Sequence, residues 1–494
     1  MPPFHRTFKH IPRIIQAKFR RPPASLPRRL TRLFNTTSSS LLPATMGSLT
    51  GLQTQPFKVL VAGGSYGGLS AALNLQDLCQ GLAPRCGPDP AEGEPVEPSP
   101  FAVDITIVNE RDGYYHVIGS PLALASEAHA EKFWVKYDDM PGLRSPNLRV
   151  LHGSVKSVDP ERKVATYLAH GSTEEPEKLQ YDYFVAASGL RRVWPVVPQS
   201  LRRKQYLFEA GDHIRAATSA RHGVVVVGGA VGIEMAAELK VTQPQLNVTL
   251  VHSRDKLLSS EPLPEEVGER SLELLKEANV TVLMSHRLDR TEEIQDDTGK
   301  DCLRLHFTNG HTMLADQVSL AVSRSIPSTT YLPTNVLDDE GYVKIQSSLT
   351  FPPNTPNAPS HFAIGDLVKW SGIKRCGGAM HMGYYAAHNI HQHMQMQMQT
   401  QTQTHTQTQT QTSDKDKEAK LLTLDEIPPM IGLAVGKKAV TYWPEAGVTA
   451  GEEVMKTFFG EDLGFASEYF HFPVLGWVLV MRLVADGNSL LESS

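Results

Sequence analysis

The chain has 494 residues, of which 40% are hydrophobic, and its 48 Lys and Arg against 53 Asp and Glu give a formal net charge of −5 at pH 7. This length predicts roughly two to four structural units, and the composition excludes collagen, a wholly disordered chain and a polytopic membrane protein. The four Cys residues form no CxxC pair, which argues against a disulfide framework, a dithiol redox centre and a Cys-based zinc site.

Residues 1–56 are a basic leader. Residues 1–45 carry nine Lys or Arg, and the first acidic residue of the chain is Asp77, so the rest of the chain is strongly acidic. An Arg-rich, Ser-containing and acid-free N-terminus is typical of a mitochondrial presequence, and we expect a mitochondrial protein. The alternative is a translation start at Met46, which would leave the protein in the cytoplasm and associated with a membrane.

A strand, a glycine turn and a helix follow the leader. The apolar run 57–62 (FKVLVA) has the composition of a parallel strand buried on both faces. Glycines between such a strand and a helix let backbone N–H groups and the positive helix end approach a pyrophosphate closely. The predicted cofactor-binding residues of this turn are Gly63, Gly64, Ser65, Tyr66, Gly67 and Gly68, with Ser65 in the middle glycine place of GxGxxG.

The next strand is predicted over 101–108 (FAVDITIV), after a surface loop over 81–100 that is rich in Pro, Gly and Glu. The end of such a strand should carry an acid that binds the ribose hydroxyls of a dinucleotide. Here Asn109 takes the usual acidic place and Glu110 follows it, so we assign the ribose contact to Glu110.

A second unit of strand, glycine turn and helix begins at Val224. Its predicted cofactor-binding glycines are Gly228, Gly229 and Gly232, while Val227 stands where the first glycine of the pattern should be. One glycine-rich turn is weak evidence, but two such turns, each followed by another strand, predict two dinucleotide sites.

The strand after the second turn ends in His252, Ser253 and Arg254, without an acid. An acid there would repel a 2′-phosphate, whereas Ser253 and Arg254 can bind one. NADPH is therefore expected as electron donor at least as readily as NADH.

Two further segments connect the first site to a flavin. Residues 181–190 (YDYFVAASGL) and 361–368 (HFAIGDLV) are strands that end in Gly189 and in Gly365-Asp366. Asp366 can accept hydrogen bonds from the ribitol hydroxyls of FAD while the following helix start faces the pyrophosphate.

The order of these motifs resembles the flavoproteins with two dinucleotide-binding domains, which include the pyridine nucleotide–disulfide reductases and alternative NADH dehydrogenases. Within them the chain looks like the apoptosis-inducing-factor-like (AMID-like) oxidoreductases, above all the fungal ones. The segments that carry this likeness are ERDGYYHVIGSPLALAS (110–126), GLRRVWPVVPQSL (189–201), VHSRDKLLSSEPLP (251–264) and KWSGIKRCGGAMHMG (369–383). The resemblance is dense over about 57–390, resumes at 428–440 and 452–464, and fades after about residue 465.

The resemblance implies an α/β fold with two Rossmann-like dinucleotide-binding domains, in which an inserted NAD(P)H domain splits the FAD domain, plus a small C-terminal region. The Gln-, Thr- and Met-rich tract offers little to bury and is expected to be disordered. The expected parts are the leader (1–56), the FAD domain (57–210 and 341–390), the NAD(P)H domain (211–340), the disordered tract (391–420) and the C-terminal region (421–494).

The family also implies hydride transfer from NAD(P)H to FAD and an acceptor that is a quinone or another electron carrier rather than a disulfide. The absence of paired cysteines near the first glycine helix agrees. Glu234 matches the family position beside the nicotinamide, where it would orient the donor carbon. The alternative for Glu234 is a solvated helix residue.

His116 and Lys374 are the other catalytic candidates. His116 follows the second strand of the FAD unit and would relay a proton to reduced flavin or quinone; the alternative is a packing residue. Lys374, followed by Arg375, would stabilise the anionic reduced flavin; the alternative is simple surface charge.

The expected partner is a quinone-like small molecule, and the expected state is a monomer or a homodimer. The acidic body argues against nucleic acid. The apolar run 472–481 is too short to span a membrane, so we expect it to be buried or to contact a membrane surface. Two alternatives stay open: a redox-sensing or cell-death signalling flavoprotein with weak activity, and a flavoenzyme that tailors a small metabolite.

Overall fold

The computed structural model describes residues 55–85, 97–322, 326–374, 376–405 and 420–465. Four of the sequence predictions concern segments that lie wholly or largely outside these residues: the leader, the middle of the 81–100 loop, the end of the Gln-rich tract and the apolar run 472–481.

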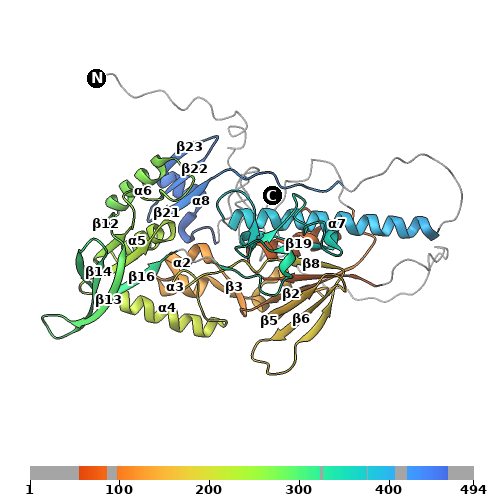
Figure 1. The fold of residues 1–494 in the computed structure, drawn as a ribbon, viewed down its shortest axis with the longest axis horizontal. Helices are drawn as coiled ribbons and strands as arrows, with labels where there is room; N and C mark the ends of the chain where they lie inside the picture. The colour runs from red at the N-terminus through yellow and green to blue at the C-terminus, as the bar shows by residue number, and fades with distance from the viewer. Residues whose placement is uncertain (1–54, 86–96, 323–325, 375, 406–419, 466–494) are drawn as a thin grey trace, which may run out of the picture. The chain divides into compact units, whose positions relative to one another are not determined.

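The larger sheet is built from two separate parts of the chain (Figure 1). Strands β19, β8, β1, β2 and β5 are parallel neighbours in that order, and β6 and β7 extend the sheet antiparallel from β5. Because β19 follows the other strands by more than 170 residues, the chain between them is an insertion in this unit. The bounds are β1 (Phe57–Ala62), β2 (Val103–Asn109), β5 (Leu148–Asp159), β6 (Val164–Ala169), β7 (Glu177–Gln180), β8 (Tyr183–Ala186) and β19 (His361–Ala363).

Two helices pack closely together beside this sheet. Helix α1 (Tyr66–Gln80) contacts α7 (Cys376–His405), and the Ser70 hydroxyl donates to the Met380 carbonyl at 2.7 Å. A Cβ atom on Gly383 of α7 would lie 2.7 Å from the Gly67 carbonyl oxygen. This contact fixes the start of α1 against the second part of the FAD unit.

The prediction that disorder begins at residue 391 is wrong, because α7 continues to His405. Ile390, Met394 and Met398 recur every four residues and are all buried, so the Met residues of the tract give the helix an apolar stripe. The many polar residues of the tract indicated disorder, whereas the four-residue spacing of its apolar residues indicates a helix.

The inserted unit has a four-stranded parallel sheet in the order β12-β11-β10-β16. The two chain crossings into and out of it run side by side, since β9 (Leu190–Arg191) pairs antiparallel with β17 (Ile326–Pro327). The elements are α4 (Arg203–Thr218), β10 (Val224–Gly228), α5 (Ala230–Thr242), β11 (Val248–Val251), α6 (Glu265–Glu277), β12 (Thr281–Leu283) and β16 (Gln317–Ala321), with an antiparallel sheet of β13 (Leu288–Gln295), β14 (Asp301–Phe307) and β15 (Thr312–Ala315).

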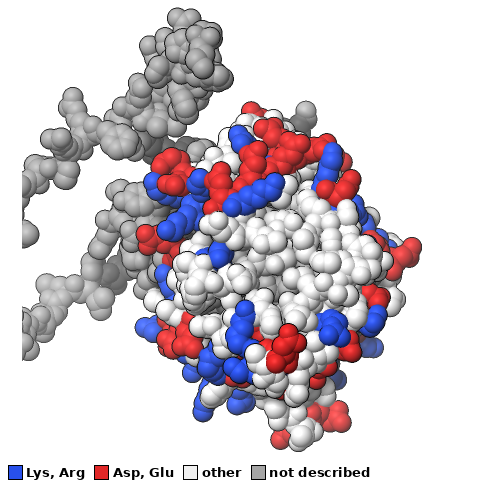
Figure 2. Space-filling view, turned by 90° about the vertical axis from the view of Figure 1, so that its left-hand side faces the viewer, with Lys and Arg blue, Asp and Glu red and all other residues white. Residues whose placement is uncertain are grey.

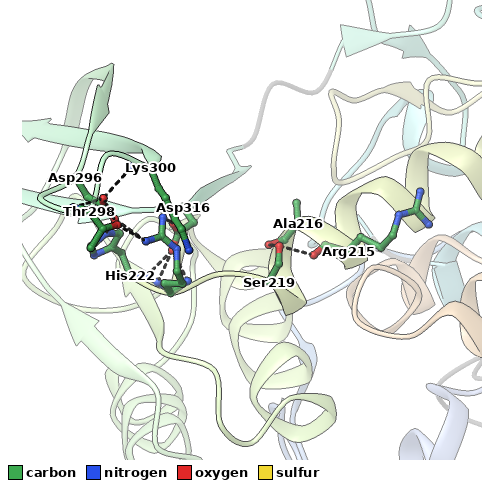
Figure 3. Close-up of polar contacts among 10 residues, drawn as sticks. Arg215, Ala216, Ser219, His222, Asp296, Thr298, Lys300 and Asp316 are labelled. Carbon is green, nitrogen blue, oxygen red and sulfur yellow. Dashed lines mark hydrogen bonds and ion pairs between the residues drawn. The ribbon is translucent and has the colours of Figure 1, made fainter.

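Two carboxylates bind the residues just before β10: Asp296 in the turn of the β13–β14 hairpin, and Asp316 between β15 and β16 (Figure 3). Asp316 accepts the backbone N–H groups of Arg221 at 2.6 Å and Gly223 at 3.2 Å. Asp296 accepts the Thr298 hydroxyl and the Arg221 guanidinium, each at 2.6 Å. The hydrogen bond from Thr298, with others to the same carboxylate, lowers the pKa of Asp296, so the cluster stays charged and holds the hairpin in place.

The C-terminal part bridges the two units. Its antiparallel strands are β21 (Ile431–Val435), β22 (Lys438–Trp443) and β23 (Gly447–Gly451), followed by α8 (Glu452–Phe458) and a short 3₁₀ turn, Gly460–Asp462. Lys438 pairs with Glu277 of α6 at 2.7 Å, and Asp462 pairs at 2.6 Å with Lys132, which ends α3 (Glu127–Lys132) of the FAD unit. These contacts hold both units against one C-terminal wall.

The smaller elements complete the FAD unit: α2 (Ser120–Ala123), β3 (Gly113–Tyr115), β4 (Trp134–Lys136), β18 (Val343–Lys344) and β20 (Val368–Lys369). The expected fold class, an α/β protein with two Rossmann-like units and a small C-terminal region, is confirmed. No helix within the described residues is long and apolar enough to cross a membrane.

Candidate active site

One cleft brings together residues from seven separated segments, among them residues 111–121 and Phe459. Its walls come from the first glycine turn, the segment after β8, the start of α5, the turn around Gly365 and β21. The predicted site residues that line it are Ser65, Tyr66, Gly67, Gly189, Glu234, Gly365, Asp366 and Lys374. The two glycine-turn helices therefore open into the same cleft.

The first glycine turn is tight at both ends. Gly63 has φ of +115°, and a Cβ atom there would lie 2.3 Å from the Ala187 carbonyl oxygen. A Cβ atom on Gly68 would lie 1.8 Å from the carbonyl oxygen of Gly63. The Gly64 N–H group donates to the Asn109 side chain at 2.9 Å, which fixes the middle of the turn. The first N–H groups of α1, which have no partner within the helix, are thus held beside the cleft.

Arg111 supplies a charged donor to the same cleft. One of its terminal nitrogens donates to the Pro198 carbonyl at 2.9 Å, while its buried Nε has no hydrogen-bond partner among the described residues. An orphaned buried donor is costly unless a ligand accepts from it. Together with the glycine cradle and the positive end of α1, Arg111 fits the pyrophosphate of FAD.

Asp366 also lines the cleft, directly after Gly365 with its φ of +79°. Its carboxylate is 3.4 Å from the guanidinium of Arg192. Burial raises the pKa of Asp366, and Arg192 and Lys374 oppose this rise. A half-buried carboxylate beside two cations is an acceptor for ligand hydroxyls, which agrees with the predicted ribitol contact.

The second glycine turn is tight at Gly228, where a Cβ atom would lie 2.5 Å from the Ala321 carbonyl oxygen, and looser at its other two glycines. Val227 stays in strand β10, paired with Val251 and Leu320, so the position needs no glycine. A Cβ atom on Gly232 would lie 3.3 Å from a Leu250 methyl carbon, and one on Gly229 would meet nothing within 4 Å. Helix α5 still begins three residues after Val227, just as α1 begins three residues after Gly63. Val227 in place of the first glycine therefore alters the turn but does not move the start of α5, whose N–H groups can still bind a phosphate.

Nine of the fifteen predicted cofactor-binding residues do not line the cleft: the turn glycines Gly63, Gly64, Gly68, Gly228, Gly229 and Gly232, and also Glu110, Ser253 and Arg254. Glu110 pairs with Arg191 at 2.8 Å and accepts from Ser154, at the end of β2 where a ribose is expected. Ser253 and Arg254 are exposed after β11. They follow the carboxyl end of β11, the same end of the sheet that carries the second glycine turn. The hydrogen bond of 3.0 Å between the ring of the preceding residue, His252, and the Gly228 carbonyl shows that the two chain segments are neighbours there.

Glu234 points from the first turns of α5 to the cleft and to the C-terminal wall. One carboxyl oxygen accepts the Ala434 N–H group of β21 at 3.3 Å. Burial raises the pKa of Glu234 to about 8, and the Ala434 hydrogen bond opposes the rise. Glu234 is therefore a partly buried cleft residue whose surroundings favour the protonated carboxyl group, and the solvated-residue alternative does not fit.

His116 does not line the cleft. It is fully buried behind Tyr66, whose hydroxyl is 3.1 Å from Nδ1, and its Nε2 bonds the Leu463 carbonyl at 3.1 Å. Burial lowers the pKa of His116 to about 4. His116 does not reach the cleft and its burial disfavours the protonated ring, so its placement does not support the proton-relay hypothesis. His116 instead joins α1 to the C-terminal segment.

The burial of His116 predicts that this residue contributes to the loss of folding stability at acid pH. Since the folded-state pKa lies below the ordinary value of about 6.5, stability is lost as pH falls from about 6.5 towards 4. His116 contributes up to about 3 kcal/mol to that loss. We expect His116→Gln to flatten the dependence of thermal stability on pH in this window, whereas His311→Gln, at an exposed position, leaves it unchanged. Identical curves for wild type and His116→Gln would contradict this.

Lys374 is held by the protein rather than free on the surface. Its ammonium donates to the Val368 carbonyl at 2.7 Å and lies 4.6 Å from the ring centroid of Tyr342. Burial lowers its pKa. The surface-charge alternative does not fit, and Lys374 is a fixed cation in the cleft; Arg375 lies outside the described residues.

Sequence reasoning missed several cleft residues. Arg111 follows directly after Glu110, and a cation next to a predicted ribose acid was the available signal. Arg192 lies in the quoted segment 189–201, but nothing local indicates that it meets Asp366. The residues Met430, Ile431, Gly432, Leu433 and Phe459 form the C-terminal wall and carry no motif.

Comparison with known proteins agrees with this site. The model of the family described as "Pyridine nucleotide-disulphide oxidoreductase" matches residues 57–393, more than half of the chain. The chain belongs to this family. Its matched range includes both glycine turns and the Gly365-Asp366 turn, whereas the C-terminal wall of the cleft lies beyond it.

Three curated relatives refine the family assignment. The chain is 48% identical over 430 residues to "Oxidoreductase OXR1" of Ajellomyces capsulatus, covering 86% of this chain and 89% of the relative. It is 26% identical to human "Ferroptosis suppressor protein 1", covering 65% and 77%, and 23% identical to "Apoptosis-inducing factor homolog B" of Dictyostelium discoideum, covering 67% and 79%. The resemblance to fungal AMID-like oxidoreductases is confirmed.

A solved structure shares the fold. The NAD-dependent persulfide reductase from A. fulgidus superimposes with a TM-score of 0.54 at 18% identity, covering 81% of this chain and 65% of that one. This likeness concerns the fold alone. With the family and the relatives, the chain is an NAD(P)H-dependent flavoprotein oxidoreductase that binds FAD.

Proposed function

We propose that this flavoprotein passes electrons from NAD(P)H to a quinone-like acceptor. The observation that carries the proposal is the shared cleft, where α1 of the FAD unit and Glu234 of the NAD(P)H unit meet a largely apolar wall. Flat apolar acceptors suit such walls. The apolar lining residues include Val117, Ile118, Val196, Val197, Ile431, Leu433 and Phe459.

The cysteines favour this acceptor over a disulfide. Of the cysteines in the described part of the chain, Cys376 lines the cleft, and Cys79 and Cys302 lie elsewhere. Within the described residues the cleft therefore has no dithiol that could exchange with a disulfide substrate. FAD, when bound, supplies the two-electron chemistry, and the chain binds, orients and shields it.

The proposal is tested with purified protein in a single assay. We expect a yellow protein that consumes NAD(P)H in proportion to added short-chain ubiquinone and does not do so with glutathione disulfide. A colourless protein, or one that turns over the disulfide instead, would overturn the proposal. If NAD(P)H bleaches the flavin but no quinone is reduced, and if NAD(P)H makes the protein dimerise, the redox-sensing alternative would be favoured.

We propose NADPH as the preferred donor, supported by the exposed Ser253 and Arg254 and by the absence of an acid directly at the end of β11. Replacing Arg254 by Ala should raise KM for NADPH about tenfold, since one charge-assisted hydrogen bond is worth about 1.5 kcal/mol or more, and leave KM for NADH unchanged. Steady-state kinetics with both nucleotides measure this, with Arg290→Ala on the distant hairpin as control. Equal effects on NADH and NADPH would contradict the assignment.

We also propose a mitochondrial location, supported by the composition of residues 1–56. A fluorescent protein fused behind residues 1–56 should enter mitochondria, and a fusion that stays in the cytoplasm would overturn this. Nucleic acid is not a proposed partner: on the face drawn in Figure 2, Lys and Arg alternate with Asp and Glu around an uncharged centre, which is unlike a basic binding face.

A further inference from the structure

Glu238 is a buried acidic residue that does not line the cleft. It follows Glu234 by one helical turn on α5, and only 3% of its surface is exposed. Its Oε1 atom is buried and has no hydrogen-bond partner among the described residues. An ionised carboxylate in this position would be strongly disfavoured. Glu238 thus holds a proton in the folded protein.

The neighbours of α5 offer no cation to neutralise this carboxyl group. Helix α2 and strands β10, β11, β16 and β21, which pack against α5, contain no titratable residue within their bounds. Helix α6 also packs against α5, but its charged side chains are exposed: Glu265, Glu266, Glu269, Arg270, Glu273, Lys276 and Glu277. Lys240 of α5 itself bonds the carbonyls of Pro244 and Leu246.

The titratable group that remains is Glu234. Residues four apart on a helix lie on the same face with side chains about 5–6 Å apart. Burial, and then the charge of Glu234, raise the pKa of Glu238 to about 8. The two carboxyl groups form a coupled pair, of which Glu234 reaches the cleft and Glu238 lies behind it.

We propose that Glu238 stores a proton behind Glu234, and that this pair on α5 delivers a proton to the acceptor reduced in the cleft. The inference rests on the proposed quinone acceptor. NAD(P)H supplies two electrons and one proton, whereas reduction of a quinone to a quinol takes two electrons and two protons. The second proton leaves the carboxyl group of Glu234, Glu238 passes its proton to Glu234, and the pair regains the one proton it has lost from solvent at the cleft.

The stored proton has a consequence for stability that does not depend on turnover. The folded-state pKa of each acid lies above its unfolded value of about 4.3, so the contribution to stability is full at low pH and is lost as pH rises from about 4.3 through about 8. Glu238→Gln removes one of these protons and keeps the size of the side chain. We expect its melting temperature to exceed that of wild type at pH 9 by about 3 °C or more, with a flatter dependence on pH.

The experiment measures melting temperature and the pH profile of quinone reduction for the full-length holoprotein. Glu269→Gln on the exposed face of α6 is the matched control and should follow wild type. In Glu238→Gln the high-pH fall of the quinone-reduction rate should begin about one pH unit lower, because Glu234 loses its partner acid. A variant that merely perturbs packing would change the rate by the same factor at every pH and would overturn the inference.

The two failures are distinguishable. If the protein reduces no quinone, the proposed function fails, and the melting curves still report the stored proton. If quinone turns over but Glu238→Gln melts with the same dependence on pH as wild type, the proton store is overturned and the proposed function stands.

Discussion

Replacing Gly68 by Ala should yield a colourless protein of lower stability. The new Cβ atom would lie 1.8 Å from the carbonyl oxygen of Gly63, which is backbone and cannot rotate away. Gly63 in turn is fixed, since its N–H group donates to the Val108 carbonyl at 2.8 Å. Overpacking costs about 1–3 kcal/mol when side chains can give way, and here the upper end or more is expected. The turn then opens and α1 no longer presents its N–H groups to FAD.

The matched control is Gly232→Ala, at the same place in the second glycine turn. There the new atom would approach only the Leu250 side chain, at 3.3 Å, which can shift. Flavin absorbance after purification and thermal melting measure both variants. Gly232→Ala should remain yellow and lose little stability, so equal loss in the two variants would show that the two turns are not as different as their geometry indicates.

The local motifs of this chain predicted the sheets because their signals are local. A strand such as FKVLVA that is buried on both faces reads as a short apolar run, and a glycine between it and a helix marks the turn. The cores at Phe57–Ala62 and Val224–Gly228 were therefore readable from the sequence. The sequence alone could not show that the second turn accepts Val227 in place of a glycine, because this depends on the pairing of Val227 within strand β10.

Burial and long-range contacts were the parts that local motifs could not give. His116 has the sequence context of a relay, but its role is set by Tyr66 and by Leu463, which lies 347 residues away. The helical start of the Gln-rich tract depends on Met394 and Met398 finding an apolar surface. The C-terminal wall of the cleft has no motif, since any apolar strand of the right length could provide it.

The position of Glu234 depends on that wall, which makes its substitution informative. Replacing Glu234 by Ala removes the group that bonds the Ala434 N–H group and opens the cleft between α5 and β21. FAD contacts come from the other unit, so the protein should stay yellow. Loss of orientation of the nicotinamide should slow flavin reduction by NAD(P)H about 100-fold, the loss typical of a misplacement of about 1 Å.

Glu234→Gln separates orientation from proton transfer. Its amide oxygen can still accept from Ala434, so the nicotinamide stays oriented and flavin reduction should slow much less than in Glu234→Ala. Because the amide has no acidic proton, reoxidation by quinone should be slowed more than reduction. Stopped-flow absorbance measures the two half-reactions separately. Equal and small effects of Ala and Gln on flavin reduction would remove Glu234 from the donor site, and a colourless Glu234→Ala protein would place its role in FAD binding instead.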